Sequence, residues 1–194
     1  MDNKQSTMSG IVRKKTGKNR VLAQCALFVV LMVVAAFIRI PFPLVPLTFQ
    51  TAVAVSAGLL LGPAAGAASM GVYLFMGLLG LPVFAGGGGF AYVLELTFGY
   101  LLGFVAAAFV AGAVRGGGRL TFARAAMAAL AGCAVNYLVG VPYFVVIWHF
   151  YMQNGGLWRA VLLYNVAYLP KDIALCFLAA AAVRAVRAAL SRRS

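Results

Sequence analysis

Long apolar segments follow one another along the chain, separated by short polar, glycine-rich or proline-rich stretches. The first covers 21–40 and ends where the prolines of PFPLVP prevent a helix from continuing. Five more apolar segments cover 48–61, 64–81, 94–114, 123–147 and 161–190. Because about 20 apolar residues are enough for a helix to cross a bilayer, the pattern predicts six transmembrane helices.

Two of these segments depart from a simple crossing. The segment 48–61 is short, so it either begins inside the membrane or follows a stretch, PFPLVPLTFQ, that folds back against the other helices. The segment 161–190 contains Pro170, which predicts a break with the long helix starting at that proline.

The composition also indicates a membrane protein. Of the 194 residues, 64% are hydrophobic and 10% are charged, and the mean hydropathy is +0.98. Soluble domains carry about 25% charged residues. The alternating pattern of a β-barrel is scarce, so backbone groups in lipid must pair within helices. The sequence therefore predicts an all-α membrane protein with one domain over 21–194, after a basic, disordered tail over 1–20.

Basic residues far outnumber acidic ones. The chain has 16 lysines and arginines against 3 acidic residues, for a net charge of +13. Most of the basic residues form three clusters: Lys4, Arg13, Lys14, Lys15, Lys18 and Arg20; Arg115, Arg119 and Arg124; Arg184, Arg187, Arg192 and Arg193. Six crossings would put all three on one side, which predicts cytoplasmic termini. This placement favours contact with anionic membrane lipids and not with nucleic acid.

The sequence contains no motif for catalysis or metal binding. Cys25, Cys133 and Cys176 lie singly within apolar segments and are interpreted as small buried residues. There is no P-loop, nucleophile elbow or metalloprotease motif. The sequence therefore predicts neither an enzyme nor a resident cofactor, and ATP-driven transport would need another subunit to hydrolyse the ATP.

Small residues recur at every fourth position in two rows. The rows are Gly58, Gly62 and Gly66, and Gly99, Gly103, Ala107 and Ala111. Such rows allow helix backbones to approach closely. Two interpretations are open at this point: packing inside the bundle, or a docking surface for another membrane subunit.

Charged residues inside apolar segments are costly and are therefore candidates for a functional site. Asp172 follows Pro170 at the start of the last long helix, where it either caps the helix or faces a ligand. Lys171 either extends to the membrane surface or enters the same pocket. Glu95, at the start of the fourth segment, is interpreted as a helix-terminal carboxylate, a partner for Arg39, or a ligand contact.

Several other residues are candidates for an apolar pocket with a few polar groups. Gln50, Asn136 and Tyr137 lie within apolar segments, where each either bonds a neighbouring helix or faces a ligand. The aromatic candidates are Phe84, Tyr92, Tyr100 and Tyr143.

Five short motifs occur in the order found in one known family. VPLTFQ (45–50), LGLPVFAGGGG (79–89) and TFGYLLGF (97–104) resemble the signatures V-P-x-T-x-Q, G-x-x-G-L-P-V-F-A-G-G-G-G and T-x-G-Y-L-x-G-F of the BioY family. NYLVG (136–140) and YLPKD (168–172) match later positions. The resemblance covers about 21–183, and its glycine segment is highly specific.

BioY proteins are the biotin-binding S-components of energy-coupling factor (ECF) transporters. The resemblance implies a six-helix protein of a prokaryotic plasma membrane, with a biotin site near the outer face that loops after the first and third helices help to close. It also implies partners, namely a transmembrane coupling subunit and two cytoplasmic ATPases. Biotin would be the transported ligand and not a cofactor.

Two motifs depart from the family pattern. PKDIAL places Lys171 before Asp172, and Leu175 occupies the position where many members have lysine. ELTFGY replaces a common G-P-T-G-G-Y, which makes Glu95 an added charge. The A-x-x-x-A docking pair that S-components often carry on the first helix is absent from 21–40.

The resemblance leads to a hypothesis for the site. Gly87 and its neighbouring glycines would let the loop backbone approach biotin and move as a gate. Glu95 and Asp172 would accept hydrogen bonds from the ureido N–H groups, and Lys171 would pair with the carboxylate. Two alternatives are a solitary carrier of biotin or another small vitamin that works without ATPases, and a membrane enzyme acting on a lipid-soluble substrate.

Overall fold

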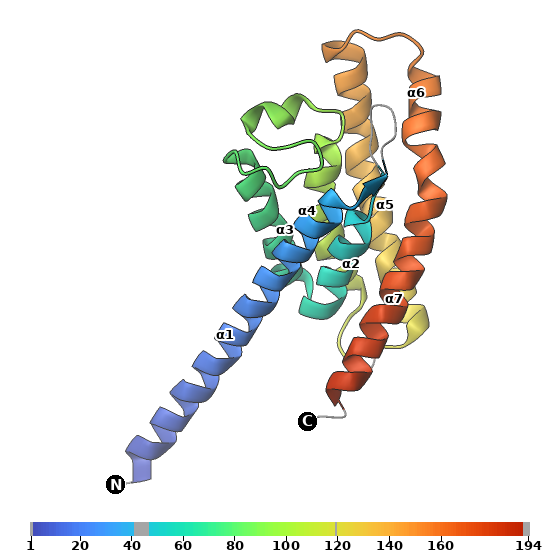
Figure 1. Ribbon diagram of the computed structural model, residues 1–194. Coiled ribbons are helices and arrows are strands. Elements are labelled where there is room, and N and C mark those ends of the chain that lie inside the picture. Colours follow the sequence, from blue (N-terminus) through green and yellow to red (C-terminus); the bar gives the residue numbers. More distant parts are fainter. Residues whose placement is uncertain (1, 41–46, 119, 192–194) are drawn as a thin grey trace.

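Helices dominate the computed structural model, which describes residues 2–40, 47–118 and 120–191 (Figure 1). The α-helices are α1 (Asp2–Phe37), α2 (Gln50–Leu61), α3 (Pro63–Leu78), α4 (Phe98–Val114), α5 (Phe122–Val146), α6 (Leu157–Tyr164) and α7 (Leu169–Ser191). Shorter helical turns cover Phe90–Leu94 and Val166–Tyr168 as 3₁₀ helix and Ile147–Tyr151 as π-helix. Two short strands, β1 (Arg39–Ile40) and β2 (Leu47–Thr48), complete the described elements.

Each of the six predicted apolar segments contains a helix. Among the described residues, Lys18–Phe37, Phe122–Tyr151 and Leu157–Leu190 are long and apolar enough to cross a membrane. Three shorter apolar helices coincide with the other predicted segments: α2 and α4 lie within theirs, and α3 begins one residue before its segment. The chain is therefore a helical integral membrane protein, as the sequence predicts.

Pro170 breaks the last apolar segment, as predicted. α6 ends at Tyr164, one 3₁₀ turn follows, and α7 begins at Leu169. Proline fits the first turn of a helix because an N–H group there has no partner within the helix. The break places Asp172 in the first turn of α7.

The first helix is longer than the sequence analysis expected. α1 begins at Asp2, where a disordered tail over 1–20 was expected. No proline interrupts this stretch, and adding residues to an existing helix is easier than nucleating a new one. The apolar part of α1 can therefore extend the helix into its polar part.

A short hairpin reverses the chain between α1 and α2. Arg39 pairs with Thr48 and Ile40 pairs with Leu47, in antiparallel register. Residues 41–46, which make up most of the stretch PFPLVPLTFQ, lie outside the described residues, so neither alternative given for this stretch is tested. The paired strands bring the end of α1 beside the start of α2.

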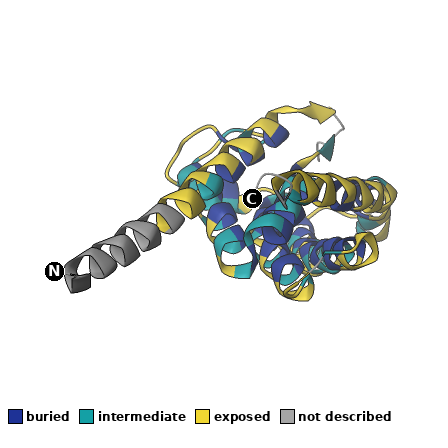
Figure 2. Cartoon of the chain, turned by 90° about the horizontal axis from the view of Figure 1, so that it is seen from below, coloured by how far each residue is buried: buried dark blue, intermediate teal, exposed yellow. Residues whose placement is uncertain are grey.

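The rows of small residues pack inside the bundle. A Cβ atom added to Gly58 on α2 would lie 2.1 Å from the carbonyl oxygen of Ala108 on α4. One added to Gly103 on α4 would lie 2.2 Å from Asn136 Oδ1 on α5. Buried residues lie on the inner faces of the helices (Figure 2). Packing within the bundle is thus confirmed for these rows, and the alternative of a docking surface is wrong.

The two ends of the bundle carry different features. Both chain termini lie at one end, together with the turn that joins α4 to α5 (Figure 1). The glycine loop between α3 and α4 lies at the other end, as does the connection from α5 to α6. The cluster members whose side chains the structure describes therefore belong to the end that carries the termini: Lys18, Arg20, Arg115, Arg124, Arg184 and Arg187.

Candidate ligand-binding site

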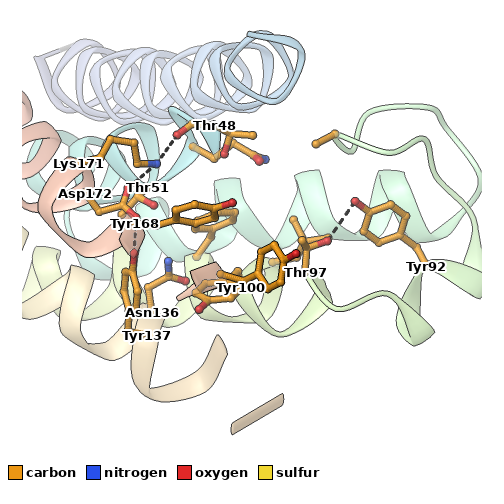
Figure 3. Close-up of a pocket in the computed structure, with 15 residues that line it drawn as sticks. Thr48, Thr51, Tyr92, Thr97, Tyr100, Asn136, Tyr137, Tyr168, Lys171 and Asp172 are labelled. Atoms are coloured by element: carbon orange, nitrogen blue, oxygen red, sulfur yellow. Dashed lines mark hydrogen bonds and ion pairs between the residues drawn. The ribbon is translucent and has the colours of Figure 1, made fainter. Parts of the chain in front are cut away.

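A pocket lies at the end of the bundle that carries the glycine loop, among the first turns of α2, α4 and α7 (Figure 3). Its empty space is about 590 Å³, which includes the solvent at its open side. Its lining residues are Thr48, Gln50, Thr51, Ala85, Tyr92, Thr97, Tyr100, Leu101, Phe104, Asn136, Tyr137, Tyr164, Tyr168, Lys171 and Asp172.

An ion pair forms one wall of the pocket. Lys171 Nζ lies 2.9 Å from Asp172 Oδ1 and donates a hydrogen bond to the Thr48 carbonyl oxygen at 2.8 Å. Tyr137 on α5 donates to Asp172 Oδ2 at 2.6 Å. Asp172 is buried, and the N-terminal end of α7 also favours its negative charge. These contacts compensate the carboxylate and tie α7 to β2 and α5.

Two buried acceptor oxygens in the pocket are candidates for a ligand contact. Asn136 Oδ1 has no hydrogen-bond donor among the described residues. Asp172 Oδ1 is paired with the Lys171 ammonium, and a carboxylate oxygen can accept a second hydrogen bond. Asn136 is only 1% exposed, and Gly103 leaves the space that its amide occupies. A buried acceptor without a donor costs about 1–3 kcal/mol. A ligand with N–H groups would therefore gain stability by donating to these oxygens.

Tyrosines supply much of the remaining wall. The rings of Tyr100 and Tyr137 meet edge to face, with centroids 5.6 Å apart. The Tyr100 hydroxyl donates to Asn165 Oδ1, which joins α4 to the break before α7. The hydroxyls of Tyr92 and Thr97 lie 3.3 Å apart. Apolar ring faces with a few fixed polar groups are typical of a site for a small organic molecule.

Comparisons with known proteins identify the family. The model of the BioY family matches residues 5–192. The chain belongs to the BioY family. It is 40% identical over 171 residues to a probable biotin transporter BioY of Lysinibacillus sphaericus, which covers 86% of this chain and 85% of that protein. A probable biotin transporter BioY of Pyrococcus horikoshii is 37% identical over 157 residues, or 80% of this chain and 89% of that protein.

A solved structure has the same fold. It is the crystal structure of the S-component for biotin from an ECF-type ABC transporter, and it matches with a TM-score of 0.73 and 26% sequence identity. The match covers 89% of this chain and 93% of that one. The relatives are named as transporters and not as enzymes, which agrees with the prediction that this BioY protein is not an enzyme.

Most of the residues predicted for the site line the pocket. They are Gln50, Tyr92, Tyr100, Asn136, Lys171 and Asp172. Gln50 also fulfils the other interpretation of its sequence position, because its Nε2 donates to the Tyr73 hydroxyl on α3 at 2.8 Å. In this BioY protein Gln50 thus both lines the pocket and bonds a neighbouring helix.

Three other predicted residues support the glycine loop and lie outside the lining. Phe84 is fully buried against Tyr92, with ring centroids 4.7 Å apart. Its backbone exchanges hydrogen bonds of 2.8 and 3.1 Å with Gly87, whose φ of 122° favours glycine. Tyr143 on α5 donates to the Val93 carbonyl oxygen. These contacts fix the shape of the loop beside the pocket.

Glu95 is not at the start of a helix, so the prediction of a helix-terminal carboxylate is wrong. The 3₁₀ turn Phe90–Leu94 ends beside it, and α4 begins only at Phe98. Its side chain is exposed and lies outside the pocket lining. Arg39, its expected partner, donates instead to the Ala85 carbonyl oxygen.

Several lining residues were not predicted. They are Thr48, Thr51, Ala85, Thr97, Leu101, Phe104, Tyr164 and Tyr168, and Tyr137 was considered without being chosen. Thr48, Thr97 and Tyr168 stand in the motifs VPLTFQ, TFGYLLGF and YLPKD, so their presence in BioY motifs was a signal that could have identified them. Tyr164 had no such signal, because its place depends on how α6 packs against α5.

Proposed function

We propose that this chain binds biotin and acts as the substrate-specificity subunit of an ECF-type transporter. Its relatives are named probable biotin transporters, and its structural neighbour is an S-component for biotin. The chain would cross a prokaryotic plasma membrane six times with cytoplasmic termini. Its partners would be a transmembrane coupling subunit and two cytoplasmic ATPases, which supply the energy that this chain cannot.

Two buried oxygens carry the proposal: Asn136 Oδ1, which has no donor among the described residues, and Asp172 Oδ1, which is paired with the Lys171 ammonium. Biotin presents two ureido N–H donors on a fused ring whose other half is an apolar thioether. The two oxygens would accept from the N–H groups, while the rings of Tyr100 and Tyr168 would contact the apolar part. Asn136 thereby takes the role that the sequence analysis gave to Glu95.

The position of Lys171 favours a different role from the one expected. Its ammonium lies 2.9 Å from Asp172, whereas the ureido ring and the carboxylate stand at opposite ends of biotin. Lys171 cannot hold the carboxylate while Asp172 holds the ureido ring unless the ion pair separates. We infer that Lys171 is the counter-ion of Asp172 and that the carboxylate of biotin points toward the mouth of the pocket.

Reconstitution into lipid vesicles tests the proposal. The chain is reconstituted alone, or with a coupling subunit and two ATPases, and uptake of labelled biotin is measured with and without ATP. ATP-dependent uptake by the complete assembly, lost in Asp172→Asn, is the expected result. Uptake by the chain alone would instead support the solitary carrier, and chemical conversion of the ligand would support an enzyme.

A further inference from the structure

The end of the bundle that carries the termini is rich in cations and poor in acids. Glu95 and Asp172 are the acidic residues whose side chains the structure describes, and both belong to the pocket end. Two arginines at the terminal end bind backbone carbonyl groups: Arg115 donates to Leu60 at 3.2 Å, and Arg124 donates to Gly117 at 3.3 Å. The described chain therefore provides no carboxylate partner for the arginines of this end.

A groove at this end brings two further arginines together. Its lining residues are Gly118, Leu120, Thr121, Phe122, Arg184, Arg187 and Ala188. Arg184 and Arg187 are three residues apart on α7, so they share one face of the helix. Neither guanidinium makes a hydrogen bond or ion pair with the described residues. Burial, and to a smaller extent the positive charge of Arg187, lower the pKa of Arg115.

The groove continues into an apolar surface. Phe122 at the start of α5 stacks on Phe177 of α7, with ring centroids 6.5 Å apart. Both rings remain partly exposed, at 39% and 42%. Phe177 lies two helical turns before Arg184, so the two side chains follow one another along the same face of α7. A cationic site thus leads directly to an exposed aromatic seam between two apolar helices.

We propose that this groove binds an anionic phospholipid, with the phosphate between Arg184 and Arg187 and an acyl chain along Phe122 and Phe177. Basic pockets between transmembrane helices on the cytoplasmic side are suited to lipid head groups. The positive charge of the arginines complements a phosphate, and the aromatic seam complements an acyl chain. A soluble acidic peptide would use the arginines but not the seam. The proposal depends on the cytoplasmic orientation of the termini but not on the identity of the transported ligand.

Native mass spectrometry of the full chain, released from detergent, tests this site. Phosphatidylglycerol and phosphatidylcholine are titrated separately, and the fraction of chain that retains lipid is measured. Arg184→Gln/Arg187→Gln is compared with Lys18→Gln/Arg20→Gln, which removes the same charge from exposed positions at the same end. We expect roughly tenfold weaker retention of phosphatidylglycerol in the first variant and little change in the second.

Two further arms separate a lipid from other anions and from misfolding. Phe122→Ala should weaken retention of phosphatidylglycerol while both arginines remain, and glycerol 3-phosphate should compete poorly because it lacks acyl chains. Unchanged thermal unfolding of the arginine variant would show that its fold is intact. Equal loss in both charge variants, equal retention of both lipids, or full competition by glycerol 3-phosphate would each overturn the proposal.

Discussion

The two ends of this BioY protein differ in whether their charged side chains are paired. At the pocket end Lys171 and Asp172 form an ion pair in which the carboxylate is buried. At the end with the termini, Arg184 and Arg187 line an open groove without an acidic partner in the described chain. The first arrangement is tied down by hydrogen bonds from Tyr137 and to Thr48.

We interpret the difference as a division between charges that would recognise a ligand and charges that would orient the molecule in the membrane. A buried charge costs several kcal/mol unless it is paired, so a chain retains one where it has a specific use. An exposed cation near a membrane surface costs little and biases the topology. Disturbing the pocket end should therefore change ligand affinity, whereas disturbing the other end should change contacts with lipid.

The largest effect is expected for Asp172→Asn. This change removes the negative charge that faces the Lys171 ammonium and replaces one carboxylate oxygen with an N–H donor, which would oppose a ligand N–H group. Biotin affinity, measured by calorimetry on the purified chain, should fall at least about 100-fold. Glu95→Gln makes the same chemical change outside the pocket and should leave the affinity unaltered. Equal effects of the two variants would contradict the assignment.

Asn136→Ala should have the next largest effect. It removes the second acceptor, which is buried and has no donor among the described residues. The loss of one such bond costs about 1–3 kcal/mol, or roughly 5- to 150-fold in the dissociation constant. Asn154→Ala, at an exposed position of the α5–α6 connection, is the control. Unchanged affinity in Asn136→Ala would show that its amide does not contact the ligand.

Gly103→Ala tests whether the packing of α4 on α5 supports the pocket. The added methyl group would lie 2.2 Å from Asn136 Oδ1, and such overpacking costs about 1–3 kcal/mol. Thermal unfolding in detergent should begin at lower temperature, and biotin should bind more weakly. Gly71→Ala on α3 is the matched control, because nothing lies within 4 Å of its added carbon. The control should keep or raise stability, since alanine favours helix.

The smallest effect is expected for Arg39→Gln. Arg39 donates to the carbonyl oxygen of Ala85, which lines the pocket, and so ties β1 to the glycine loop. Losing one exposed hydrogen bond, worth about 1 kcal/mol, should speed biotin release about fivefold in stopped-flow displacement. Arg159→Gln, which lies outside the pocket lining, should release biotin at the original rate. Faster release in both variants would argue against a specific tether.

The sequence was most informative where one interaction decides the local structure. The length of apolar segments located the membrane helices, and Pro170 located the start of α7. It failed at Glu95 because a 3₁₀ turn and a three-residue connection precede α4, and composition does not distinguish them from a first helical turn.

The candidate site could be predicted only in part, and for a physical reason. Charged and amide groups in apolar segments are costly, which pointed to Asp172 and Asn136. Tyr164 and Thr51 reach the pocket through the packing of separate helices, which a linear pattern does not contain. Phe84 belongs to the most specific motif, yet it is buried beneath the loop. A motif therefore marks a functional region, but it does not distinguish residues that line the pocket from residues that support the loop beside it.

The most direct test of the central claim is calorimetry of the purified chain with biotin, desthiobiotin and lipoate. Biotin and desthiobiotin share the ureido ring, and lipoate offers a carboxylate and a sulfur ring without it. If Asn136 and Asp172 accept from ureido N–H groups, the first two ligands should bind one-to-one and lipoate should bind far more weakly. Absence of biotin binding, or equal binding of lipoate, would contradict the account.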